Sequence, residues 1–129
     1  MKKFRIPVTH HETGEFNRFL YETIENGIFM FNECMRDFPR ELVIGKEEQF
    51  IERYDKKGKE IYENDICKIR FDIDKVEDYL YASLTEKEIR TCERVFVVES
   101  PLFNNQPELN ADIIEIIGNI HENPEILND

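Results

Sequence analysis

The chain has 129 residues and carries 17 Lys and Arg against 28 Asp and Glu, a net charge of −11 with neutral histidines. This length predicts one core in a single domain over residues 1–129, and 40% hydrophobic residues exclude a disordered chain. The charge opposes direct binding of DNA or RNA, because such binding needs basic side chains that displace counterions from phosphates.

Apolar side chains at every second position predict a half-buried strand over residues 3–9, in which Pro7 suits an edge position. Phe4, Ile6 and Val8 are the apolar positions, and Lys3, Arg5 and Pro7 alternate with them. Residues 16–24 fit both a strand and a helical stripe. We favour a strand, because turn residues precede it at 11–14 and its aromatic and β-branched side chains suit a hairpin. Asn26–Gly27 marks a second turn before the apolar run 28–31.

Residues 32–47 predict a loop with one short strand at 42–44. Residues 48–54 lead into a turn at 55–59, where Gly58 can take a positive φ and Asp55 can accept hydrogen bonds from nearby backbone. Beyond it, residues 61–71 continue as strand with a polar break at 63–65.

The apolar spacing between residues 74 and 92 is more typical of helix than of strand and predicts one or two short helices. Thr85 and Glu88 match a capping box, with Thr85 as the N-cap residue. Further strands are expected over 95–98 and 113–120, with a polar loop at 104–107 between them.

Two segments carry a recognisable pattern: residues 54–66 read YDKKGKEIYENDI, and residues 116–127 read IIGNIHENPEIL. The first resembles the run D-K-N-G-K-E-I-Y-E-G-D-I-V of the YopX family of phage and prophage proteins. The second resembles that family's ending I-G-N-I-Y-E-N-P-E-L-L, and residues 3–5 fit its first strand. Asn64 stands where the family has Gly and can take the same left-handed turn, whereas His121 replaces a Tyr.

The resemblance implies a mainly β fold, a small antiparallel barrel of the SH3 type, with the helices at about 74–92 as an insertion. It implies no biochemical activity. Folding alone accounts for both motifs: the first reverses the chain twice, and the second buries Ile116, Ile117 and Ile120 before Asn123–Pro124 ends the strand.

Three groups of residues are candidate sites. His10 and His11 could bind a metal with His121 or a cysteine, but adjacent strand residues point to opposite faces, so we interpret them as exposed loop histidines. The acidic run 72–78 lacks the Gly and the last Glu of a calcium loop, and a solvated acidic cluster at a helix start is the better interpretation.

The cysteines Cys34, Cys67 and Cys92 are odd in number and far apart, which is typical of a reducing compartment, so we expect a cytoplasmic protein. None has a recognisable basic partner, and Cys67 is interpreted as a small buried strand residue. The sequence contains no apolar stretch of the length of a membrane span and no apolar core of a signal peptide, so neither secretion nor membrane insertion is expected.

We therefore expect a phage- or prophage-derived accessory protein that binds an unknown protein partner and is not an enzyme, with no catalytic residue, cofactor or metal. Self-association is left open. The alternative is a nucleic-acid-linked role, either direct binding by residues 53–75 or DNA mimicry by residues 99–129, which hold seven acidic residues and no Lys or Arg. A third alternative is metal-assisted hydrolysis at the acidic run 72–78.

Overall fold

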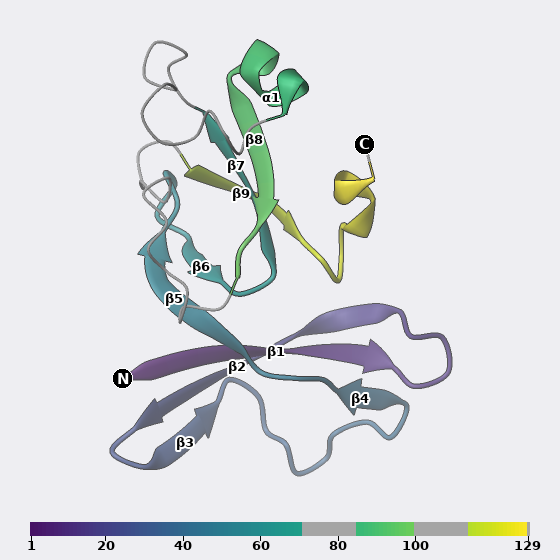
Figure 1. Ribbon diagram of the computed structural model, residues 1–129. Helices are drawn as coiled ribbons and strands as arrows, with labels where there is room; N and C mark the ends of the chain where they lie inside the picture. The colour runs from purple at the N-terminus through teal and green to yellow at the C-terminus, as the bar shows by residue number, and fades with distance from the viewer. Residues whose placement is uncertain (71–84, 100–113, 129) are drawn as a thin grey trace.

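The computed structural model describes residues 1–70, 85–99 and 114–128, which form two antiparallel sheets (Figure 1). The first sheet has the order β3-β2-β1-β5-β6, with β4 also paired to β1, and the second has the order β8-β7-β9. The strands of the first sheet are β1 (Lys2–His10), β2 (Phe16–Glu25), β3 (Ile28–Phe31), β4 (Leu42–Ile44), β5 (Glu48–Tyr54) and β6 (Glu60–Tyr62). Those of the second are β7 (Asp65–Arg70), β8 (Glu93–Val97) and β9 (Ile114–Asn119). The mainly β, antiparallel expectation is confirmed.

The predicted first strand is confirmed as β1, but its expected edge position is wrong. β1 lies inside the sheet, between β2 on one side and β4 and β5 on the other. The carbonyl of Pro7 accepts a hydrogen bond of 2.8 Å from the amide of Gly45, between the residues of β1 that pair with β5 and with β4. Because the nitrogen and carbonyl of one strand residue point to the same side, the proline nitrogen faces this gap and no ladder bond is lost.

The hairpin of β2 and β3 follows from its turn residues. Asn26 and Gly27 have φ angles of 53° and 77°, and Glu25 pairs with Ile28 across them. A two-residue loop with positive φ at both positions matches the right-handed twist of the flanking strands. The choice of strand over helix for residues 16–24 is thus confirmed.

The turn between β5 and β6 has the predicted geometry. Gly58 has φ +81°, and one carboxylate oxygen of Asp55 accepts hydrogen bonds of 2.9 Å from the amides of Lys57 and Lys59. The second turn is also as predicted, since Asn64 takes the left-handed conformation with φ 69°.

Gly58→Val is expected to destabilise the protein by more than about 1 kcal/mol, because a β-branched residue is poorly tolerated at this φ. The ideal Cβ position has no neighbour within 4 Å among the described residues, so the cost comes from backbone conformation and not from a clash. Urea unfolding measures it. The control is Lys57→Ala in the same turn, whose 65% exposed side chain makes an ion pair with Glu115, and its expected cost is about 0.5 kcal/mol or less. A harmless Gly58→Val would contradict the assignment.

Within residues 1–70, 85–99 and 114–128, many of the buried apolar side chains gather in two clusters, where the sequence suggested one core. One cluster lies on the first sheet, and the other joins β5 and β6 to the second sheet. The first comprises Ile6, Val8 and Leu20, and the second comprises Ile51, Ile61, Cys67, Val98 and Ile114. The isoleucines at 116, 117 and 120 that were expected to be buried are only half-buried, and Ile114 occupies the core instead.

The helix α1 (Glu86–Thr91) begins at the predicted capping box, in which the amide of Glu88 donates to Thr85 Oγ1 and the amide of Thr85 donates to Glu88 Oε2, both at 3.2 Å. The rest of the predicted helical stretch, 74–84, and the loop 104–107 lie outside the described residues. A short 3₁₀ helix, η4 (Pro124–Leu127), follows Asn123.

Candidate functional site

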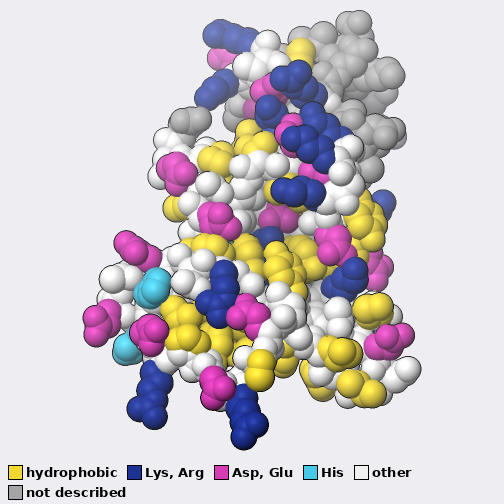
Figure 2. Space-filling view, turned by 180° about the vertical axis from the view of Figure 1, so that it is seen from behind, with side chains coloured by type: hydrophobic (Ala, Val, Ile, Leu, Met, Phe, Trp, Pro, Cys, Tyr) yellow, Lys and Arg dark blue, Asp and Glu magenta, His cyan; other side chains and the backbone are white. Residues whose placement is uncertain are grey.

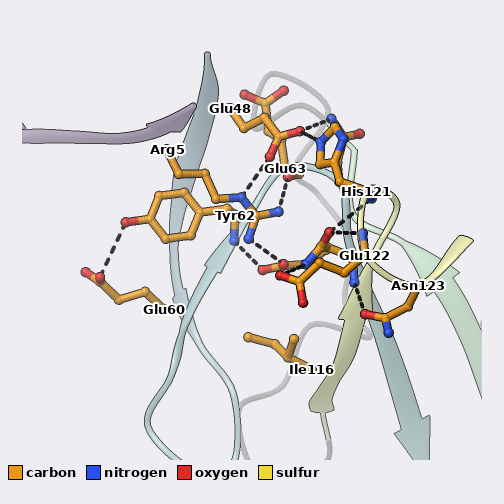
Figure 3. Close-up of polar contacts among 12 residues, drawn as sticks. Arg5, Glu48, Glu60, Tyr62, Glu63, Ile116, His121, Glu122 and Asn123 are labelled. Carbon is orange, nitrogen blue, oxygen red and sulfur yellow. Dashed lines mark hydrogen bonds and ion pairs between the residues drawn. The ribbon is translucent and has the colours of Figure 1, made fainter. Parts of the chain in front are cut away.

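A buried arginine lies where the two sheets meet. Arg5, on β1, is only 4% exposed, and its guanidinium donates hydrogen bonds to two buried carboxylates and one carbonyl (Figure 3). Nε donates to Glu48 Oε1 and one terminal nitrogen to Asp65 Oδ1, each at 2.7 Å. The other terminal nitrogen donates to the carbonyl of Glu63 at 3.0 Å. Charge-assisted bonds to separate groups hold the guanidinium in one orientation.

Aromatic rings complete the surroundings of this guanidinium. Its central carbon lies 4.2 Å from the ring centre of Phe19 and 5.1 Å from that of Tyr62. A guanidinium over aromatic faces gains further attraction when it is removed from water. The alternation of polar and apolar residues in β1 predicts that Arg5 faces solvent, but its side chain is buried.

The two carboxylates have further donors from distant parts of the chain. Glu48 Oε2 lies 2.7 Å from Asn64 Nδ2 and 2.6 Å from His121 Nε2, and Asp65 Oδ2 accepts from the Tyr62 amide at 2.8 Å. Burial raises the pKa of the Asp65 carboxyl, whereas the charge of Arg5 acts in the opposite direction. The polar donors and the single guanidinium together stabilise two carboxylates that are at most 3% exposed.

The two motif segments of the sequence thus meet at Arg5. Residues 54–66 supply Tyr62 and Asp65, and residues 116–127 supply His121. Sequence reasoning explained each motif by its own turns and missed that they share this network. One sequence signal could have indicated the network: Arg5 lies in residues 3–5, which also fit the family pattern.

A cavity of about 500 Å³ lies beside the network. One wall consists of aromatic rings, including Tyr21 and Tyr62, and the other of β9 residues from Ile116 to Asn119. Most of its charged groups are engaged with other side chains: Arg5 and Asp65 with each other, and Glu60 with Lys3 at 2.6 Å. Lys59 also lines the cavity, and its ammonium group makes no ion pair among the described residues. This pattern of mutual pairing is that of a structural junction between the sheets.

The three histidines that were considered as metal ligands do not form one cluster. His10 and His11 line a separate surface cavity beside Arg40, whereas His121 is part of the Arg5 network. Within residues 1–70, 85–99 and 114–128, no three His, Cys, Asp or Glu side chains gather as metal ligands. The acidic run 72–78 lies outside the described residues.

The cysteines occupy three different environments. Cys34 is exposed, and Cys92 is the left-handed C-cap residue of α1, with φ 56°. Cys67 is fully buried in β7, and burial raises the pKa of its thiol to about 12. The interpretation of Cys67 as a small buried strand residue is confirmed.

The strand β3 exposes an apolar surface. Its residues Ile28, Phe29, Met30 and Phe31 are 64%, 61%, 65% and 40% exposed. β3 is the last strand of its sheet, and Figure 2 shows hydrophobic side chains gathered at the lower right, over the hairpin of β2 and β3. Four consecutive exposed apolar residues on an edge strand are unusual, because soluble proteins protect such edges.

The backbone of β3 is also available for pairing. The amide of Asn32 donates to the Tyr21 carbonyl at 2.9 Å, so the alternation of the antiparallel ladder directs the backbone groups of Phe29 and Phe31 away from β2. The sequence predicted the turn before this apolar run, but the position of β3 at the edge of the sheet and its exposure became visible only in the structure.

The comparisons with known proteins provide a family. A family model described as "YopX protein" matches residues 8–128. Curated proteins gave no match to the chain. In the described part of the chain, no helix is long and apolar enough to cross a membrane.

Proposed function

The chain belongs to the YopX family, and from this premise we propose that it is a phage-type accessory protein that works as a non-enzymatic protein-interaction module. The observation that carries the proposal is the exposed apolar strand β3. Removing its side chains from water stabilises a complex by about 25 cal/mol for each Å² of apolar surface buried.

The chemistry of the Arg5 network supports the same proposal. Its buried ions are bound to one another, and its rings pack on the guanidinium, so the network holds the two sheets together. β1 provides Arg5 and is hydrogen-bonded to β2, which in turn carries β3. The exposed strand therefore projects from a rigid support, which lowers the entropic cost of binding.

The alternative from a different class is the nucleic-acid-linked role. The net charge of −11 weighs against direct binding of phosphates, whereas mimicry of DNA toward a basic protein is compatible with it. The experiment described next distinguishes direct nucleic-acid binding and DNA mimicry from the main proposal.

We expect the tagged protein to retain a partner from host lysate, with and without nuclease, and the double variant Phe29→Asp with Met30→Asp to retain at least about tenfold less. The reason is that carboxylates at the centre of an apolar interface lose their hydration without a partner. The measurement is quantitative mass spectrometry of the retained proteins.

The matched control is Val95→Asp, because Val95 is an apolar residue, 40% exposed, on β8 of the other sheet. It should retain the partner, and all variants should unfold in urea as the wild type does. Equal retention by the double variant would contradict the proposal. Recovery that depends on intact nucleic acid would favour the alternative.

A further inference from the structure

We propose that the outer edge of β3 binds an extended strand of the protein partner, and that this strand carries a lysine or arginine directed at Glu22. The inference rests on the proposed function and names the chemistry of the partner.

The backbone of β3 selects the shape of the ligand. The outward amide and carbonyl groups of Phe29 and Phe31 alternate along the edge, and an extended chain has the matching spacing of donors and acceptors. Its side chains would alternate between the two faces of the sheet. On one face they would meet Phe29 and Phe31, and on the other Ile28 and Met30.

Glu22 selects the charge of the ligand. It is 2% exposed, and its Oε1 is a buried oxygen without a hydrogen-bond partner among the described residues. Burial raises the pKa of its carboxyl, and repulsion from Glu47 acts in the same direction. A buried acceptor without a donor is costly, so a donor from outside would be well stabilised there.

The register places Glu22 within reach of an added strand. Glu22 faces Phe31 across the β2–β3 ladder, so both side chains lie on the same face of the sheet. An added strand would lie two strand spacings from β2, about 10 Å. A long cationic side chain laid across the Phe31 ring spans this gap together with the glutamate side chain, and the ring attracts the cation.

The overall charge favours this occupant over a second copy of the chain. Two copies would bring together net charges of −11 each, whereas a basic strand is attracted and steered by the same field. The exposed Glu25 at the end of β2 adds to the negative potential beside β3.

The test uses a synthetic peptide of about ten residues, the upper length of most strands, that alternates valine and threonine around one arginine. We expect amide shifts in NMR spectra of the whole protein to concentrate in β3 and in the neighbouring part of β2. We expect Glu22→Gln to weaken binding about tenfold, equivalent to about 1.4 kcal/mol. A peptide with glutamine in place of arginine should bind equally weakly to the wild type and to Glu22→Gln, because the two changes remove one interaction.

Undiminished binding to Glu22→Gln, or shifts away from β3, would overturn the inference. So would a homodimer, seen by sedimentation, that is abolished by the double variant Phe29→Asp with Met30→Asp. A native partner that is lost with this double variant but unaffected by Glu22→Gln would overturn the inference and leave the proposed function standing. Peptide binding as expected, with no native partner that depends on β3, would instead remove the proposed function.

Discussion

Arg5→Met is expected to lower the free energy of unfolding by about 3–5 kcal/mol, the usual cost of removing one partner from a buried ion pair. The variant keeps an apolar stem of similar length but leaves Glu48 and Asp65 without the guanidinium that lies 2.7 Å from each. Both carboxylates are at most 3% exposed, so little water reaches them to replace the lost donor. Urea unfolding at neutral pH gives the value.

The pH dependence identifies the cause. In Arg5→Met the folded-state pKa of the Asp65 carboxyl rises further, because burial and repulsion from Glu48 are no longer opposed by a cation. The folded chain then binds more protons than the unfolded chain, and its stability relative to the wild type increases as the pH falls from about 7 toward the unfolded pKa of about 4. The difference in the free energy of unfolding between the wild type and Arg5→Met should therefore become smaller as the pH falls from about 7 to about 4.

The matched control is Arg18→Met. Arg18 makes an ion pair with Glu33 at 2.7 Å, but both side chains are about a third exposed, at 35% and 32%. Its loss should cost no more than about 1 kcal/mol. If Arg5→Met costs as little as this control, the Arg5 network does not hold the sheets together.

Asp55→Ala is expected to cost about 3 kcal/mol. Asp55 is 3% exposed and accepts hydrogen bonds from the amides of Lys57 and Lys59 within its turn, and from the amide of Ile116 at 3.2 Å. The last bond joins the turn to β9, so the substitution removes a link between the two motif segments as well as the turn. Each hydrogen bond to a charged acceptor contributes about 1.5–3 kcal/mol to stability. The expected total is smaller than the sum of the three, because water can replace the carboxylate as acceptor for the amides of the exposed turn.

Asp55→Asn separates the two roles. The amide oxygen can still accept from Lys57 and Lys59, so the turn is kept while the charge and the second carboxylate oxygen are lost. We expect about half the cost of Asp55→Ala, together with faster hydrogen exchange at the amide of Ile116. A cost below about 1 kcal/mol for Asp55→Ala would show that the contact with β9 is dispensable.

The sequence by itself determined the local structure. The turn at Asn26–Gly27, the positive φ of Gly58 and the capping box of Thr85 depend on residues within a few positions of one another, so their residue types suffice. The two motif segments likewise sufficed to identify the family, which the match over residues 8–128 confirms.

Only the tertiary structure decided which polar and apolar residues are exposed. The alternating pattern of its strand predicts that Arg5 is exposed to solvent. It is buried instead, and it binds Glu48 and Asp65, which lie 43 and 60 positions away in the sequence. Phe29 lies in an apolar run, but its side chain is 61% exposed on β3, the last strand of its sheet. Period shows which residues share a face of a strand, whereas the pairing of distant segments decides what covers that face.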